Sequence, residues 1–169
     1  LCGQPVLAHT LAAFEALGDS LAGIALVLAP EDSLLPELLP GLEARGVSLL
    51  RCGGTTRADS VRQGLKAWAA LPQGPQAQDW VLVHDAARCL VTPGEVQSLI
   101  EACRDDAVGG LLASAVTSTE PDAAHWGRSL SPLVALPPSF TFLPVFILAA
   151  SVGASPVTLY ILLSLPLTK

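Results

Sequence analysis

The sequence predicts an α/β domain with a Rossmann-like, mostly parallel sheet. Short apolar runs alternate with helical patterns about four times along the chain, with short connections between them. Two of these runs end in polar loops that carry Gly, Asp, Arg and Ser, as buried parallel strands do where their carboxyl ends form a ligand crevice. Apolar residues make up 51% of the chain, which is ample material for a core.

The first half of the chain predicts two helices and two strands. Pro5 to Leu17 has apolar residues near one helical face, with Pro in the first turn and Gly18 after the last. Gly23 to Ala29 is a continuous apolar run, typical of a strand covered on both faces. A short helix limited by prolines is predicted within Glu31 to Ala44, and the next strand is predicted at Val47 to Leu50.

The second half continues the alternation. A helix is predicted over Asp59 to Ala70 and a strand over Trp80 to Val83. A capping-box pattern begins the next helix at Thr92, which runs to about Arg104. Val108 to Val116 then completes the series as a strand. Because the series starts with a helix and the chain contains no Met, we expect a fragment of a longer product that lacks the first strand of its fold.

Charge and cysteine content narrow the function classes. The net charge of −6 argues against a nucleic-acid partner, since binding a phosphate backbone needs clustered Lys and Arg. The four cysteines show no CxxC spacing, and we interpret them as reduced thiols of a cytoplasmic protein, with metal ligation or a redox pair as the alternative. The first residues contain no secretory signal pattern.

The composition changes after residue 119. We therefore divide the chain into an α/β domain over residues 1–119 and an apolar, Pro-rich tail over 120–169, which has no charge between Arg128 and Lys169. Three interpretations of the tail stay open: a non-native extension, a loosely packed or disordered tail, and a membrane segment. A membrane helix needs about 20 apolar residues, which Phe140 to Leu165 supplies only as a proline-kinked helix.

The two polar loops carry the candidate chemistry. Asp85 directly follows a predicted buried strand, and a carboxylate in that place suits Mg²⁺, which completes its shell with water and substrate phosphates. Arg88 offers a planar fork that matches phosphate or carboxylate. The alternatives are that Asp85 caps the following turn and that Arg88 forms a surface ion pair with it. In the other loop, Gly53 and Gly54 allow the backbone to approach a flat base.

A family resemblance is carried by two motifs in this order, Gly53-Gly54-x-x-Arg57-Ala58-Asp59-Ser60-Val61 and Val81-Leu82-Val83-His84-Asp85-Ala86-Ala87-Arg88. They resemble the 2-C-methyl-D-erythritol 4-phosphate cytidylyltransferase family of the non-mevalonate isoprenoid pathway. The opening Gly3-x-Pro5-Val6-Leu7-x-His9-Thr10-Leu11 is also similar to that family, and the resemblance extends from Leu1 to Thr119. It implies a nucleotidyltransferase fold, transfer of CMP from CTP to methylerythritol phosphate, and release of pyrophosphate.

The resemblance also implies roles for individual residues. Asp85 matches the aspartate that binds Mg²⁺ and bridges the nucleotide phosphates, and Arg88 matches a catalytic-site arginine that helps bind methylerythritol phosphate. Main-chain groups at Gly54 and Thr55, with the hydroxyl of Ser60, match those that read the cytosine edge.

Three further residues are also implied. Arg57 matches a residue that shapes the site or faces the phosphates, and the backbone of Ala86 lies near the ribose. Thr119 matches a threonine that contacts the substrate bound by a neighbouring subunit. For Ser60, a position at the start of a helix leaves an N-cap role open as the alternative.

The chain also departs from the family pattern. Cys89 stands where the family usually has Pro, and Ala115-Val116-Thr117-Ser118-Thr119 replaces a Pro-Val-x-Asp-Thr pattern. The family's Gly-rich phosphate loop is expected upstream of Leu1, and the arm through which the family forms homodimers has no match. We therefore expect a monomer or an apolar aggregate with little or no activity. Three functions stay open: a member of the enzyme family, a catalytically inactive nucleotide-binding fragment, and a membrane-tethered interaction protein.

Overall fold

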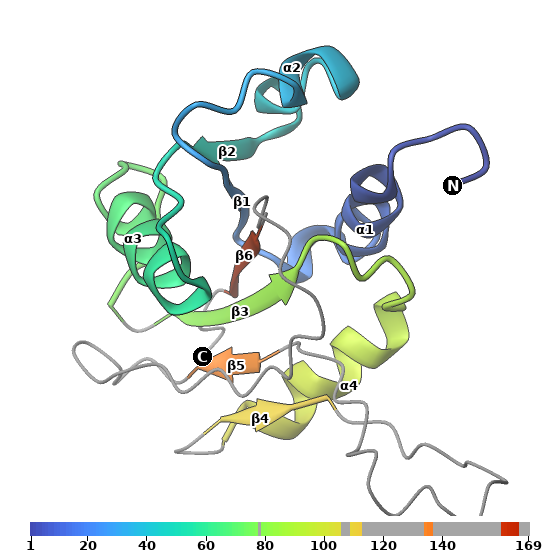
Figure 1. The fold of residues 1–169 in the computed structure, drawn as a ribbon. Helices are drawn as coiled ribbons and strands as arrows, with labels where there is room; N and C mark the ends of the chain where they lie inside the picture. The colour runs from blue at the N-terminus through green and yellow to red at the C-terminus, as the bar shows by residue number, and fades with distance from the viewer. Residues whose placement is uncertain (78, 106–108, 113–133, 137–159, 166–169) are drawn as a thin grey trace, which may run out of the picture.

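The computed structural model describes residues 1–77, 79–105, 109–112, 134–136 and 160–165. These residues form a six-stranded sheet with helices on both faces (Figure 1). The strands are β1 (Gly23–Val27), β2 (Val47–Leu50), β3 (Trp80–Asp85), β4 (Gly110–Leu111), β5 (Val134–Leu136) and β6 (Tyr160–Leu165). The α/β class predicted from the sequence is confirmed.

The strand order is β2-β1-β6-β3-β5-β4. β1 and β2 pair in parallel, with Ile24 opposite Val47. β6 runs antiparallel to both β1 and β3, and β5 runs antiparallel to both β3 and β4. It follows that β1, β2, β3 and β4, the four strands predicted from the sequence, share one direction.

The helices lie within or overlap the segments that the sequence predicts. They are α1 (Val6–Glu15), α2 (Leu35–Leu38), α3 (Arg57–Ala69) and α4 (Pro93–Cys103), with 3-10 turns at Gly18–Ser20 and Glu43–Arg45. The capping box predicted at α4 is present, since the Thr92 hydroxyl accepts from the Glu95 N–H and the Glu95 carboxylate accepts from the Thr92 N–H.

One of the two middle helices was predicted correctly, and the start of the other needs correction. The short helix predicted within Glu31 to Ala44 is confirmed as the four-residue α2, which ends where Leu39 leaves helical geometry directly before Pro40. The helix predicted from Asp59 begins two residues earlier, with Thr56 as its N-cap. The proposed N-cap role of Ser60 is therefore wrong, and Ser60 lies in the first turn of α3.

Both faces of the sheet are covered, and the strand residues alternate between them. Ala25 and Val27 of β1 pack with Val61 and Trp68 of α3. The intervening Leu26 packs on the opposite face, with residues of α1 and α4. Figure 1 shows the same division, with α3 on one side of the strands and α1 and α4 on the other. Burial on both faces explains why β1 reads as a continuous apolar run.

Two strands come from the predicted tail. β5 and β6 lie within residues 120–169 and were not predicted from the sequence. β6 is the last part of the Phe140 to Leu165 stretch considered as a kinked membrane helix, and the part from 140 to 159 lies outside the described residues. Among the described helices, none combines the length and apolar character that a membrane crossing requires. Of the strand predicted at Val108 to Val116, the described part is β4 and its immediate neighbours.

Candidate functional site

The two polar loops lie at one edge of the sheet, because β2 and β3 run in the same direction and both loops follow their carboxyl ends. The first loop folds back over the end of β1, where the N–H of Gly53 donates to the carbonyl of Leu28 at 2.7 Å. Asp85 is the last residue of β3 and begins the second loop. Arg57 begins α3 directly after the first loop, and Arg88 lies in the second loop. The two loops therefore face one shared edge.

The first loop is held by the hydroxyl of Ser60. This hydroxyl accepts from the N–H of Gly54 at 3.0 Å and lies 3.0 Å from the carbonyl oxygen of Thr56, to which it donates. Ser60 is only 1% exposed. The structure thus gives this hydroxyl internal partners that fix the glycine pair. Contact between the Ser60 hydroxyl and a cytosine base stays a prediction.

Thr56 and Asp59 rigidify the same turn. The Thr56 hydroxyl donates to the Asp59 carboxylate at 2.8 Å, and Arg62 donates to the same carboxylate at 3.1 Å. Both hydrogen bonds lower the pKa of Asp59, and the bond from Thr56 has the larger effect. Asp59 stays ionised at neutral pH and supports the start of α3, where negative charge is favourable.

Gly53 allows the close approach of the first loop to β1. A Cβ at this position would lie 2.8 Å from the carbonyl oxygen of Leu28 and 3.1 Å from its carbon, both backbone atoms. We expect Gly53→Ala to lower the free energy of unfolding by about 1–3 kcal/mol, because the backbone must shift. Urea denaturation measures this.

Gly94→Ala is the matched control for Gly53→Ala. A Cβ at Gly94 would meet no atom within 4 Å, and alanine in a helix is favoured over glycine by up to about 1 kcal/mol. This variant should be neutral or more stable. Equal effects of the two substitutions would contradict the close-approach argument.

Asp85 makes both contacts considered as alternatives to a ligand role. Its Oδ1 accepts from the N–H of Ala87 at 3.2 Å, which caps the turn. Its Oδ2 lies 3.7 Å from Nε of Arg88, in an ion pair. The side chains of Asp85 and Arg88 are 24% and 39% exposed, so this pair is loose and solvated. A ligand at the edge would therefore share Oδ2 with Arg88, at the weaker of the two contacts.

Two contacts from α1 fix the position of the second loop. The hydroxyl of Thr10 donates to the buried carbonyl of Ala86 at 2.8 Å, across 76 residues of sequence. The ring of Phe14 meets the ring of His84 edge to face, with centroids 5.1 Å apart. Sequence reasoning missed these positioning roles. The available signal was Thr10 itself, a polar residue on the otherwise apolar face of a predicted helix.

His84 is buried and neutral. Its Nε2 lies 3.0 Å from the carbonyl oxygen of Arg88 and must donate, since a carbonyl only accepts. The other nitrogen, Nδ1, is buried and has no hydrogen-bond partner among the described residues. Burial lowers the pKa of His84; the Arg88 carbonyl and Asp85 oppose this, and the charges of Arg88 and Arg57 reinforce it.

The lowered pKa of His84 predicts acid sensitivity of the fold. The unfolded chain binds a proton at this residue near its usual pKa of about 6.5, whereas the folded chain binds it only at lower pH. This contribution to stability is therefore complete above about pH 6.5 and falls as the pH is lowered toward the folded-state pKa. We expect His84→Gln to reduce the slope of unfolding free energy against pH in that window. Urea titrations over the window measure it, and an unchanged slope would contradict the assignment.

The site offers a metal ion one carboxylate. Among the residues that the structure describes, no group of three or more His, Cys, Asp or Glu side chains gathers to form a metal site. A single carboxylate fits Mg²⁺ only in the mode where water and substrate phosphates supply the other ligands. Asp85 therefore suits a metal that arrives with a nucleotide.

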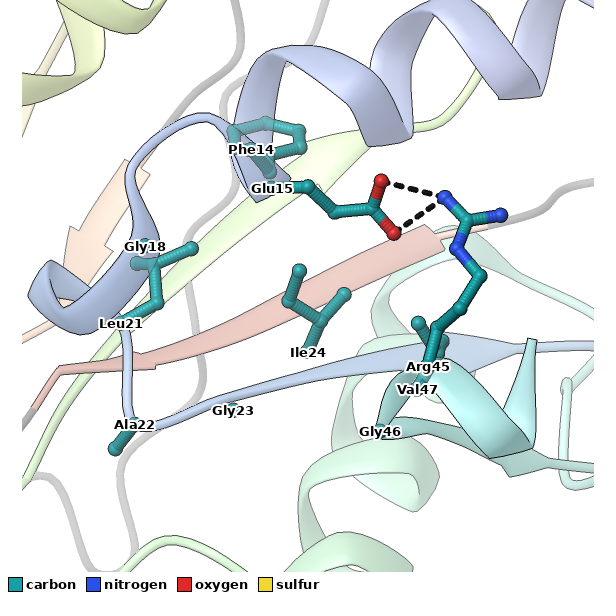
Figure 2. A pocket seen from close by; sticks show the side chains of 10 residues that line it. All are labelled: Phe14, Glu15, Gly18, Leu21, Ala22, Gly23, Ile24, Arg45, Gly46 and Val47. Atoms are coloured by element: carbon teal, nitrogen blue, oxygen red, sulfur yellow. Dashed lines mark hydrogen bonds and ion pairs between the residues drawn. The ribbon is translucent and has the colours of Figure 1, made fainter.

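The remaining predicted site residues lie in different places. The backbone of Gly54, Thr55 and Ala86 is at the shared edge, whereas Thr119 lies outside the described residues. A hollow of about 550 Å³ lies at the other edge of the sheet, near Gly23 and Val47, where β1 and β2 begin. Figure 2 shows the Glu15 carboxylate and the Arg45 guanidinium paired above Ile24 in this hollow. None of the predicted site residues lines it.

Comparison with known proteins identifies relatives in the family that the two sequence motifs resemble. A family model described as 2-C-methyl-D-erythritol 4-phosphate cytidylyltransferase matches residues 1–125. The protein of that name from Laribacter hongkongensis is 46% identical over 119 residues, covering 70% of this chain and 49% of that protein. A bifunctional enzyme IspD/IspF from Albidiferax ferrireducens is 45% identical over 119 residues, covering 70% of this chain and 27% of that protein.

A solved structure is similar as well. The crystal structure of a 4-diphosphocytidyl-2C-methyl-D-erythritol synthase superposes with a TM-score of 0.64 at 29% sequence identity, covering 79% of this chain and 66% of that one. This likeness confirms the predicted Rossmann-like nucleotidyltransferase fold. The chain spans about half the length, or less, of the curated relatives named here.

Proposed function

This chain belongs to the 2-C-methyl-D-erythritol 4-phosphate cytidylyltransferase family, and from that premise we propose that its shared loop edge binds CTP with Mg²⁺ and transfers CMP to 2-C-methyl-D-erythritol 4-phosphate. One observation carries the proposal: the glycine loop and the Asp85 turn follow the carboxyl ends of strands that run in the same direction, and so face the same edge of the sheet. The glycine loop and the Asp85 carboxylate thus lie at the carboxyl end of the sheet, which is where α/β folds bind nucleotides.

Each residue has a role in this proposal. The backbone of Gly54 and Thr55 contacts the cytosine edge, and Ser60 holds that backbone in place from beneath. The main chain of Ala86 lies near the ribose. Asp85 would hold Mg²⁺, which when bound offsets the charge of the triphosphate.

The proposed reaction is a direct displacement. A phosphate oxygen of methylerythritol phosphate forms a bond to the α-phosphorus of CTP, the bond from that phosphorus to the bridging oxygen breaks, and pyrophosphate leaves with the electron pair. Arg88 orients the incoming phosphate through its planar fork. No covalent enzyme intermediate is needed, so the contribution of the chain is orientation and charge stabilisation.

A second candidate function is nucleotide binding without turnover. The small number of positive charges placed at the loop edge favours this second function. Two described arginines, Arg57 and Arg88, are assigned to the site, and Arg88 already lies beside Asp85. Stabilising a reacting triphosphate takes several convergent positive charges. We place either function in the cytoplasm, which the four free thiols support.

A pyrophosphate-release assay with CTP, methylerythritol phosphate and Mg²⁺ separates the two functions. Steady release that requires all three components establishes transfer. Calorimetric CTP binding without release establishes the second function, and absence of both contradicts the proposal.

Calorimetry also tests the metal prediction. We expect Mg²⁺ alone to give no measurable binding, since one carboxylate is a weak site, whereas Mg²⁺ should raise the affinity for CTP. CTP affinity that is equal in Mg²⁺ and in EDTA would contradict the role of Asp85 as metal ligand.

A further inference from the structure

The centre of the sheet is held by the last strand of the chain. β6 lies between β1 and β3, with five residue pairs from Gly23↔Ser164 to Val27↔Tyr160 and six from Trp80↔Leu165 to Asp85↔Tyr160. From this centre, β1 leads outward to β2 and β3 leads outward to β5 and β4. This is the switch point of the sheet, outside which α/β folds bind their ligands.

The two halves of the candidate site are carried by strands that do not adjoin. The first loop rests on β1 and β2, through the bond from Gly53 to Leu28. The second loop rests on β3. In the strand order of the sheet, β1 and β3 meet only through β6, whose first residue, Tyr160, pairs with both Val27 and Asp85. Figure 1 shows β6 between these two strands.

We propose that β6 assembles the candidate site: by docking between β1 and β3, it sets the separation of the two polar loops. Adjacent strands lie about 4.8 Å apart, so β6 keeps β1 and β3 two spacings apart. Without β6, both strands present unpaired backbone groups to each other. The sheet would then either close by one spacing or open, and displacements of about 1 Å already damage a catalytic geometry.

Docking of β6 and binding of a nucleotide are therefore thermodynamically coupled: a ligand that bridges the two loops stabilises the docked strand, and the docked strand raises the affinity for the ligand. This coupling rests on the proposed function. The position of β6 does not, and it is tested separately.

Cross-linking in the full chain tests the position. Val81 and Ser164 are directly paired, and paired residues share a face of the sheet. We expect Val81→Cys with Ser164→Cys to form an intramolecular disulfide on mild oxidation, identified as a linked peptide by mass spectrometry. The matched control is Leu82→Cys with Ser164→Cys, because Leu82 lies one position along β3 and faces the other side. Equal linking in both pairs, or none in the first, would overturn the proposal.

Hydrogen exchange and CTP binding test the coupling. Leu162→Pro removes a ladder donor from the centre of β6, whereas Leu162→Val keeps it. We expect the proline variant to lose amide protection in both β1 and β3 and to bind CTP in Mg²⁺ at least tenfold more weakly, with the valine variant near wild type. In the wild-type chain, CTP with Mg²⁺ should raise protection of β6.

The remaining outcomes distinguish the role of β6 from its coupling to nucleotide binding. Unchanged amide protection and unchanged CTP affinity in Leu162→Pro would overturn the proposed role of β6. Absence of CTP binding by the wild-type chain would overturn the proposed function and the coupling, while a linked Val81–Ser164 peptide would still establish the position of β6. Where the proline variant does not fold, the cross-link decides the position, and the protection of wild-type β6 with and without CTP decides the coupling.

Discussion

Phe14→Ala is expected to lower the free energy of unfolding by about 3–5 kcal/mol, the cost of truncating a fully buried aromatic side chain. Phe14 is completely buried in the core between α1 and the sheet. Its ring also contacts the ring of His84 edge to face. The substitution therefore leaves a cavity directly beneath the loop that carries Asp85.

Urea denaturation with Phe14→Ala, Phe14→Leu and Leu90→Ala measures the effect. Phe14→Leu keeps most of the buried apolar volume and should cost clearly less than Phe14→Ala. Leu90 is 86% exposed, so Leu90→Ala should stay within about 0.5 kcal/mol of wild type. A loss below about 1 kcal/mol in Phe14→Ala would show that the contact between α1 and β3 contributes little to the core.

The elements that were predicted from the sequence are those with local signals. The helix α4 has a capping box within four residues, and β2 and β3 are short apolar runs that end in polar loops. The start of α3 was misplaced because Thr56 and Ser60 both suit an N-cap, and only the geometry shows that Thr56 accepts from the Asp59 N–H.

The contacts that position the site are long-range, which is why the sequence did not predict them. The turn at Asp85 and its ion pair with Arg88, which the sequence leaves open as alternatives to ligand roles, both lie within three residues and both are present. The hydrogen bond from Thr10 to Ala86 crosses 76 residues. A helical pattern places Thr10 on the buried face but does not identify the carbonyl that it meets.

β6 was missed for a different physical reason. A strand at the centre of a sheet covered on both faces lacks the alternation of an edge or half-exposed strand, so its sequence is a plain apolar run. Tyr160–Leu165 lies in a long apolar, uncharged region where the same pattern also suits a membrane segment or an unstructured tail. Strand pairing, a property of the whole sheet, distinguishes these possibilities where periodicity does not.

Asp85→Asn is expected to reduce CTP affinity in Mg²⁺ at least tenfold while leaving the affinity in EDTA unchanged. Loss of a supporting interaction at a metal site alone costs about 10–100-fold in metal affinity, and this substitution removes the ligand charge itself. Asparagine keeps an oxygen that can accept from the Ala87 N–H, so the turn is preserved. The variant therefore separates the charge of Asp85 from its role in the turn.

Asp19→Asn provides the matched control, because it makes the same change in net charge in the 3-10 turn before β1, on an exposed residue. It should bind CTP as the wild-type chain does in both solutions. Calorimetry of the two variants, each with Mg²⁺ and with EDTA, gives four affinities. Only if the loss is confined to Asp85→Asn in Mg²⁺ does the carboxylate hold the metal. An equal loss in EDTA would instead assign Asp85 to the shape of the loop, and the edge would then bind the nucleotide through its backbone and arginines alone.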